Sequence, residues 1–254
     1  GKESQPDIIG LCEVENIRCL KALALYSPLS AFEYRIVHYE SPDPRGIDVA
    51  LLYNPRTFKL INSKPLPVIV GEKKKQRSRD ILLVKGVLLP KDTVCVFVNH
   101  WSSRRMGEEQ SESKRLQAAA VLRSAIDSVK RTSKTIGVIA IGDFNDTPSN
   151  ASISTVLGAG DCSKKASDLC NLSWQYEFPG TYKYKGNWDT FDQIIVSASL
   201  QKKFPKNSAK ICNEPFLLID DVKYSGQEPF RTFRGMRYEG GFSDHLPVLL
   251  ELGR

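Results

Sequence analysis

The sequence predicts an α/β fold in which strands dominate and one long helix connects two of them. Strand-like apolar runs recur along most of the 254 residues, and residues 109–130 carry the spacing of an amphipathic helix between two buried-looking strands. Such a strand–helix–strand crossover is typical of an α/β sheet. Neither an internal repeat nor a Gly/Ser- or Pro-rich linker divides the chain, so we predict a single domain over residues 1–254.

The predicted elements follow one another with short polar breaks. Besides the helix at 109–130, a shorter helix is predicted after the first strand, and another begins near Ser149. The stretch 71–79 (GEKKKQRSR) is most simply a solvated loop, with phosphate contact as the alternative. The predicted strands cover residues 7–14, 34–40, 48–54, 58–69, 80–89, 93–101, 136–143, 181–188, 191–198 and 245–252.

Charge and hydropathy narrow the class of protein. The chain has 36 Lys and Arg against 29 Asp and Glu, a formal charge of +7, which favours polyanions such as nucleic acid or an anionic membrane surface. No run approaches the roughly 18 apolar residues of a membrane span, so we expect a soluble protein without stable membrane insertion. We also expect a monomer. The start GKESQPDIIG is not a signal peptide; if one has been removed, the protein is secreted or periplasmic.

The six cysteines lack the C-x-x-C spacing of a zinc or redox site. Cys162 and Cys170 flank a polar loop and could close a disulfide in an oxidising compartment or remain reduced; the sequence leaves both open. The chain also lacks the G-x-x-x-x-G-K-[ST] of a P-loop and the G-x-S-x-G of a serine hydrolase. These absences argue against zinc, nucleoside-triphosphate and acyl-enzyme chemistry.

Polar groups cluster where apolar strands end. They are Glu13 after the first run, Asn99 and His100 after the sixth, Asp143 and Asn145 after the seventh, and Asp244 and His245 before the last. Strand ends of this kind converge on one rim of a sheet sandwich, so separate segments can build one site.

Each residue alone has an ordinary interpretation. Glu13 could be a solvated strand end, Asp143 and Asn145 could form a turn with Gly142, and a lone histidine is more often structural than catalytic. His38 has no polar neighbour and is predicted to be structural. Together, however, carboxylates such as Glu13 and Asp244 offer oxygen ligands to Mg²⁺, and histidines suit proton transfer and phosphate binding near neutral pH.

In order along the chain, several motifs resemble those of the DNase I-like endonuclease/exonuclease/phosphatase family, with N-H-W-x-S-R pointing to its bacterial endonuclease-like branch. The resemblance covers nearly the whole chain, and the ordered set is far more specific than any member. The motifs are LCEVEN (11–16), RGIDVALLY (45–53), NHWSSR (99–104), GDFND (142–146), FDQIIVS (191–197) and GFSDHLPV (241–248).

The resemblance implies a four-layered α/β sandwich, with two mixed sheets face to face between helices and a site at one rim. It implies a metal-binding Glu13 with Asp244 beside the metal, which would be Mg²⁺, or else Mn²⁺ or Ca²⁺. The family's first strand, which carries a metal-site Asn, does not precede Gly1, so the resemblance implies an incomplete metal site in this sequence.

The resemblance also implies roles around the phosphate. Asp143 and Asn145 match the pair that activates water and holds phosphate, and Asp192 matches the residue that orients the final histidine, His245. His245 would act as general base or stabiliser. His100 with Asn99 would contact phosphate or protonate the leaving oxygen, and Arg45 and Arg79 are weaker candidates for phosphate contacts.

Three functions remain open. A nuclease acting on DNA or RNA is favoured by the charge, by the basic stretches 71–79 and 102–105, and by Trp101 and Trp188, which could stack on bases; alternatively Trp101 packs into the sandwich edge. A phospholipid or sugar-phosphate enzyme keeps the chemistry, but the sequence shows no convincing apolar surface loop for lipid. A non-catalytic binding module is disfavoured because the other motif residues are intact.

Overall fold

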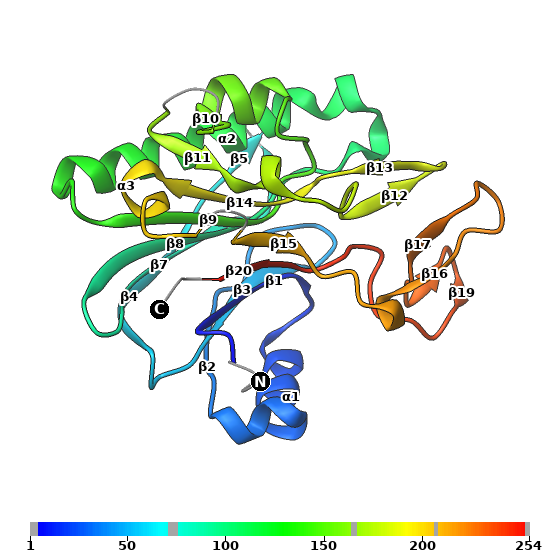
Figure 1. Ribbon diagram of the computed structural model, residues 1–254, viewed down its shortest axis with the longest axis horizontal. Coiled ribbons are helices and arrows are strands. Elements are labelled where there is room, and N and C mark those ends of the chain that lie inside the picture. Colours follow the sequence, from blue (N-terminus) through cyan, green and yellow to red (C-terminus); the bar gives the residue numbers. More distant parts are fainter. Residues whose placement is uncertain (1–4, 71–75, 164–166, 206–207, 252–254) are drawn as a thin grey trace.

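The computed structural model describes residues 5–70, 76–163, 167–205 and 208–251. The elements stack in four layers (Figure 1). Helix α2 (Glu108–Thr132) and the π-helical turn η3 (Ser152–Leu157) cover one face of a large mixed sheet. A smaller sheet packs on the other face of the large sheet, and α1 (Ile17–Tyr26) covers the outside of the smaller sheet.

The large sheet has the strand order β10-β11-β14-β9-β8-β7-β4. Its central strands β8 and β9 are parallel and are joined by α2, which is the crossover that the sequence predicts. β8 also pairs antiparallel with β7, and β9 with β14. The strands are β4 (Phe58–Leu66), β7 (Ile81–Leu88), β8 (Asp92–His100), β9 (Gly137–Asp143), β10 (Ala159–Gly160), β11 (Leu169–Asn171) and β14 (Asp192–Ser197).

The smaller sheet has the order β1-β3-β2, and the pair β15–β20 lies beside it against the large sheet. Its strands are β1 (Ile8–Val14), β2 (Arg35–His38), β3 (Asp48–Tyr53), β15 (Ala209–Ile211) and β20 (Val248–Leu250). Hairpins and short turns complete the chain: β5 (Ile69–Val70) with β6 (Gln76–Arg77), β12 (Tyr182–Tyr184) with β13 (Asn187–Asp189), β16 (Leu218–Asp220) with β17 (Gln227–Pro229), β18 (Phe233–Arg234) with β19 (Arg237–Tyr238), α3 (Ala198–Gln201), η1 (Pro28–Phe32), η2 (Arg104–Met106), η4 (Leu172–Gln175) and η5 (Pro215–Leu217).

Three apolar layers hold these elements together, and β8 shows how. Alternate side chains of a strand point to opposite faces, so Cys95 and Phe97 pack toward α2 while Val94, Val96 and Val98 pack toward the smaller sheet. Because both faces are buried, the strand reads as a continuous apolar run. Each fully buried side chain of this size contributes about 1.5–3 kcal/mol.

The same alternation places β3 between the second and third apolar layers. Val49 and Leu51 face the large sheet, whereas Ala50 and Leu52 face α1. Helix α1 begins where the Asn16 side chain accepts hydrogen bonds from the backbone N–H groups of the first turn. The four-layered sandwich predicted from the resemblance is therefore confirmed.

Several predicted elements differ in detail. The predicted strand 181–188 is a hairpin, because Lys185 and Gly186 adopt left-handed backbone conformations between β12 and β13. The predicted strand 245–252 is reduced to β20, since His245 makes only an isolated bridge with Tyr182 and Pro247 has no N–H for a ladder. Cys162 and Cys170 form a disulfide, which settles the open alternative. Residues 71–75 of the predicted loop and residue 252 lie outside the described residues.

Within the described ranges, the structure contains no helix with both the length and the apolar character required to cross a membrane.

Candidate active site

Strand pairing brings three of the predicted residues to one rim of the large sheet. His100 ends β8 directly opposite Asp143, the last residue of the parallel strand β9. Asp143 in turn pairs with Asp192, the first residue of the antiparallel strand β14. The carboxyl ends of β8 and β9 and the amino end of β14 therefore coincide. This topology assembles an imidazole and two carboxylates from residues that are 43 and 49 positions apart in the chain.

Glu13 reaches the same rim from the smaller sheet. The β1–β3 register shifts between Leu11 and Val14, and Glu13 adopts φ = 57°, so a bulge redirects its side chain. Its Oε1 lies 4.0 Å from Nε2 of His100 and 3.5 Å from Nη2 of Arg45. The Glu13 side chain is 58% exposed, so its carboxylate remains accessible from solvent.

The turn after β9 holds the carboxylate of Asp143 in place. Gly142 has φ = 123°, and a Cβ there would lie 2.0 Å from the Asn99 carbonyl oxygen, so only glycine fits. Asn145 donates to Asp143 twice, from its backbone N–H to Oδ1 (2.8 Å) and from Nδ2 to Oδ2 (2.9 Å). Burial nevertheless raises the pKa of Asp143 to about 7, against the opposing effects of His245, Asn145 and Arg79.

His100 is buried, and its Nε2 lies 3.5 Å from Oδ2 of Asp143. Burial lowers the pKa of His100 well below its usual value, and the charges of Arg79, Arg45 and His245 lower it further. The imidazole is therefore neutral at pH 7. Its Nδ1 is buried without a hydrogen-bond partner among the described residues.

His245 is held by Asp192, as the resemblance implies. Its Nδ1 donates to Oδ2 of Asp192 at 2.7 Å, and its ring lies 4.8 Å from the ring of Tyr182. Burial disfavours the charged imidazolium, but the carboxylates of Asp192, Asp143 and Asp244 outweigh it and raise the pKa of His245 to about 10. The site thus contains one neutral and one charged histidine.

Arg79 and Asn99, which were predicted to contact substrate, instead form hydrogen bonds within the protein. The Arg79 side chain is 5% exposed, and its guanidinium donates to the carbonyls of His100 (2.9 Å) and Trp101 (2.6 Å) and to Asp43 (2.8 Å). Asn99 is fully buried, and its Nδ2 donates to the carbonyls of Phe97 and Ile141. This geometry fits positioning roles for both residues. Of the predicted phosphate contacts, Arg45 is the half-exposed one.

The two tryptophans that were predicted to stack on bases, Trp101 and Trp188, differ in their exposure. Trp101 is 2% exposed, its Nε1 donates to Oδ1 of Asn99, and its ring packs edge-on against Phe144, so it lies within the sandwich and cannot stack on bases. Trp188 is partly exposed and packs edge-on against Phe178.

Sequence reasoning missed a buried ionic network behind the site. Asp146 is 1% exposed and its Oδ1 lies 2.7 Å from both Nη2 of Arg104 and Nε of Arg115. Arg104 also donates to the Asn145 carbonyl at 2.8 Å, which ties the network to the Asp143 turn. Two signals were available, Asp146 as the last residue of GDFND and Arg104 as the last residue of NHWSSR. Their pairing across more than 30 residues is not visible in a local pattern.

The rim has oxygen ligands that fit a hard divalent cation. Glu13 is accessible and Asp244 is exposed, and carboxylates such as these are the ligands that Mg²⁺ prefers. A second group, His38, Glu40 and Asp48, places its ligand atoms within 4.8 Å of one another. There, however, Nε2 of His38 and Oδ2 of Asp48 already bond at 2.9 Å, which is consistent with the structural role expected for His38.

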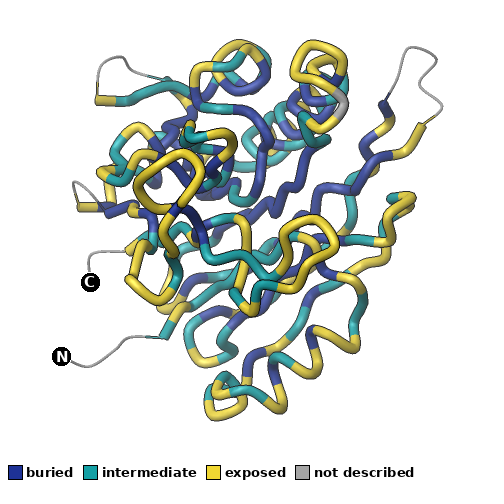
Figure 2. Tube along the Cα trace, turned by 90° about the vertical axis from the view of Figure 1, so that its right-hand side faces the viewer, coloured by how far each residue is buried: buried dark blue, intermediate teal, exposed yellow. Residues whose placement is uncertain are grey.

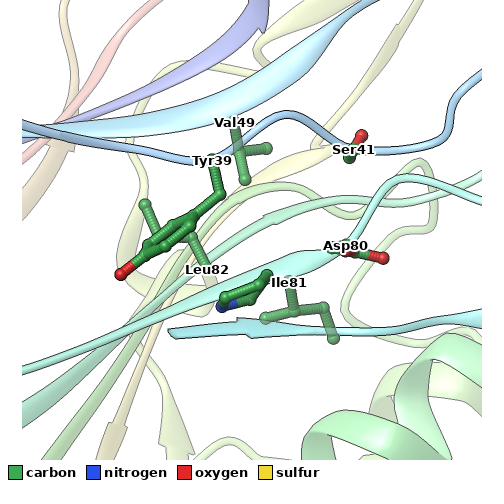
Figure 3. Close-up of a pocket in the computed structure, with 7 residues that line it drawn as sticks. Tyr39, Ser41, Val49, Asp80, Ile81 and Leu82 are labelled. Atoms are coloured by element: carbon green, nitrogen blue, oxygen red, sulfur yellow. The ribbon is translucent and has the colours of Figure 1, made fainter. Parts of the chain in front are cut away.

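One small pocket in the described part of the chain lies apart from the rim residues. It lies between strands β3 and β7 (Figure 3). Its volume is about 10 Å³, which is room for about one water. The predicted site residues are not among its lining residues, which are mainly apolar: Tyr39, Ser41, Val49, Pro65, Asp80, Ile81 and Leu82.

Comparisons with known proteins agree with this architecture. A model described as the endonuclease/exonuclease/phosphatase family matches residues 1–254. None of the curated proteins matches the chain in sequence.

Solved structures share the fold. TDP2 of D. rerio in complex with a single-strand DNA product is 16% identical, with a TM-score of 0.59 over 96% of this chain and 85% of that chain. The human Nocturnin catalytic domain is 19% identical, with a TM-score of 0.59 over 96% and 80%. A mannosyl-6-phosphatase of Bacteroides thetaiotaomicron is 18% identical, with a TM-score of 0.60 over 98% and 85%.

Proposed function

The chain belongs to the endonuclease/exonuclease/phosphatase family, and we propose that it is a divalent-metal-dependent phosphodiesterase that acts on nucleic acid. The observation that carries the proposal is the continuous set of contacts along the rim, from Glu13 through His100 and Asp143 to the Asp192–His245 pair. These groups supply an accessible oxygen ligand, a proton acceptor and a cationic donor within one site.

Asp143 is the proposed general base. A base works best when its pKa lies near the working pH, and burial raises that of Asp143 to about 7. Its two bonds from Asn145 orient the carboxylate and leave Oδ2 facing His100. Asp143 would accept the proton of the attacking water, and Asn145 would hold Asp143 in position.

The two histidines would have different roles because they differ in charge at pH 7. His245 carries a positive charge at pH 7 because Asp192 supports its imidazolium, so it would donate a hydrogen bond to a phosphate oxygen and stabilise the negative charge that develops there. This charge favours the stabilising role over the general-base role. Neutral His100, with its proton assigned to Nε2, would orient Asp143 and contact the phosphate.

Glu13 and Asp244 would hold the metal, and Mg²⁺ fits these ligands, with Mn²⁺ or Ca²⁺ as alternatives. When bound, the cation supplies positive charge against the phosphate oxygens. Arg45, half-exposed beside Glu13, would add a further phosphate contact.

Nucleic acid is the proposed substrate because the chain carries a formal charge of +7 and because one structural neighbour, D. rerio TDP2, is complexed with a single-strand DNA product. The test is to incubate the purified chain with Mg²⁺ or with EDTA on single-stranded DNA, plasmid DNA, RNA, sphingomyelin, mannose 6-phosphate and bis-p-nitrophenyl phosphate. We expect Mg²⁺-dependent cleavage of a nucleic acid and of bis-p-nitrophenyl phosphate.

The His245→Ala variant is the negative control for this test. Cleavage of sphingomyelin or mannose 6-phosphate in preference to nucleic acid would replace the proposed substrate but keep the chemistry. Inactivity of the folded wild-type chain on the whole panel would refute the proposed reaction.

A further inference from the structure

One segment near the site lies outside the layered sandwich. Residues 214–242, here called the arm, contain η5 and the strand pairs β16–β17 and β18–β19, and they project at one end of the molecule (Figure 1). Figure 2, which looks at that end, shows that much of the chain facing the viewer is exposed. The arm leads directly into Ser243, Asp244 and His245, so its last residue lies three positions before a site residue.

The arm exposes large apolar side chains that a soluble surface normally covers. Single exposed apolar residues are ordinary, but a group within one short segment marks an interaction surface. The sequence did not reveal this surface. The expectation that the chain has no convincing apolar surface loop was therefore wrong. The exposed fractions are 61% for Phe216, 42% for Ile219, 97% for Val222, 41% for Tyr224, 56% for Phe233, 99% for Met236, 68% for Tyr238 and 59% for Phe242.

The hairpin β18–β19 separates two kinds of side chain. Phe233 pairs across the hairpin with Tyr238, and their ring centroids lie 5.4 Å apart. Arg234 pairs with Arg237, and because side chains alternate along a strand, these arginines point to the opposite face from the rings. Met236 occupies the turn. The hairpin thus combines an exposed aromatic face with a cationic one.

The arm is attached firmly to the elements that hold His245. The ammonium group of Lys183, in β12, bonds to Asp221 at 2.9 Å and to the Ser225 carbonyl at 2.8 Å, and both side chains of the ion pair are buried. β12 also carries Tyr182, whose ring packs against His245. The β16–β17 part of the arm is therefore held in a defined position relative to His245.

We propose that the arm binds unpaired bases of a single-stranded nucleic acid on Phe233, Tyr238 and Phe242, beside the phosphate that the rim cleaves. This inference rests on the proposed function and adds the form of the substrate. Aromatic rings stack on any base whose face is free, whereas the faces of bases within a duplex are already stacked. The exposed rings therefore select single strands over duplexes.

Flat aromatic rings with an exposed arginine next to one of them favour nucleic acid as the occupant. Arginines accompany the rings: Arg234 bonds to Glu228 at 2.6 Å, and Arg237, 82% exposed, lies 3.3 Å from Glu239. The Glu228 side chain is only 9% exposed, so Arg234 is held at its carboxylate. A surface ion pair such as Arg237–Glu239 is worth about 1 kcal/mol or less, so Arg237 can exchange its carboxylate for a phosphate. Arg237 precedes Tyr238 in β19 and points to the opposite face, so a strand that stacks a base on Tyr238 would pass over the edge of the hairpin to bring a phosphate to Arg237.

The decisive measurement is binding of a fluorescent single-stranded oligonucleotide of about 12 nucleotides, followed by anisotropy in EDTA so that it is not cleaved. The test variant is Phe233→Ala/Tyr238→Ala, and its matched control is Tyr26→Ala, which removes an 86% exposed ring from the end of α1. We expect the double variant to weaken binding at least about tenfold, the control to leave binding unchanged, and Phe233→Trp/Tyr238→Trp, which keeps both rings, to retain affinity.

The outcomes separate this inference from the proposed function, because hydrolysis of bis-p-nitrophenyl phosphate reports the chemistry without the arm. Equal oligonucleotide affinity in the wild type and the alanine variant overturns the inference, whatever the hydrolysis assay gives. Arm-dependent binding to phosphatidylcholine/phosphatidylserine vesicles without oligonucleotide binding also overturns it, and assigns the surface to a membrane. Arm-dependent oligonucleotide binding in a protein that hydrolyses no substrate supports the arm and refutes the proposed reaction.

Discussion

The rim and the arm are neighbours in space but are built in opposite ways. At the rim, His100 and Asp143 are buried, Asp192 and His245 are mostly buried, and each is contacted by another site residue. On the arm, Phe233, Met236 and Tyr238 are exposed, and the neighbouring Arg237 is 82% exposed. The rim fixes positions and charge states, whereas the arm offers accessible ring faces.

This difference indicates a division of labour. Groups that take part in bond cleavage lose efficiency when misplaced by about 1 Å, so they require a buried supporting network. Groups that provide affinity for a polymer can be exposed, because stacking tolerates small shifts and any base can be accepted. Changes at the rim should therefore lower the rate on every substrate, whereas changes on the arm should affect only polymeric substrates.

The largest expected effect comes from His245→Ala. Removal of the cationic donor should lower kcat by at least about 10³-fold on both nucleic acid and bis-p-nitrophenyl phosphate, because stabilisation of the developing charge is lost. Steady-state kinetics and thermal melting measure this. Wild-type rates in the variant would contradict the role of His245, and the arm variant Phe233→Ala/Tyr238→Ala should keep its rate on the small substrate.

Arg79→Ala tests the support beneath the rim. Its guanidinium forms a buried ion pair with Asp43, so truncation should lower the free energy of unfolding by about 3 kcal/mol and leave Asp43 with Arg45, whose Nε lies 3.8 Å away. Urea unfolding measures the change. Arg45→Ala, which removes a half-exposed guanidinium nearby, should change stability by less than about 0.5 kcal/mol. Equal effects of the two variants would show that Arg79 does not act as a buried support.

The pH dependence of stability tests the charge of His245. Its pKa is raised from 6.5 to about 10 in the folded protein, so its contribution is complete below pH 6.5 and is lost as the pH rises through 10. Above about pH 8 the Asp143 titration is largely complete, so between pH 8 and 10 the unfolding free energy should fall by on the order of 2 kcal/mol.

Asp192→Asn removes the carboxylate bonded to His245 and is the control for that pH profile. The variant should lose much of the slope between pH 8 and 10, as measured by urea unfolding in EDTA. An identical slope in the wild type and the variant would mean that Asp192 does not support the imidazolium.

The smallest expected effect concerns the metal. Glu13→Gln should raise the Mg²⁺ concentration for half-maximal activity by about tenfold, because an amide is a weaker ligand than a carboxylate, while stability should change little at this exposed position. Glu40→Gln, in the alternative group with His38 and Asp48, is the matched control and should leave the Mg²⁺ dependence unchanged. The reverse pattern would place the metal in that second group.

Much of the framework was predictable because its signals are local. Continuous apolar runs indicated the strands buried on both faces, such as β3 and β8, and the helix at 109–130 became α2 with nearly the same limits. Polar residues at strand ends indicated Glu13, His100 and Asp143, which the structure brings together. Errors arose where a turn interrupts an apolar stretch, as at Lys185 and Gly186 within the predicted strand 181–188.

The sequence by itself determined the family, the longer strands and helices, and the residue types that meet at the rim, because the hydrophobic period and the order of motifs are properties of the chain itself. Only the tertiary structure decided which polar side chains remain accessible to a ligand. Arg45 and Arg79 are equivalent in the sequence, yet one is half-exposed and the other is buried against Asp43. The exposed rings of the arm are a tertiary property for the same reason: burial depends on which distant segments pack nearby, and a local pattern does not record that.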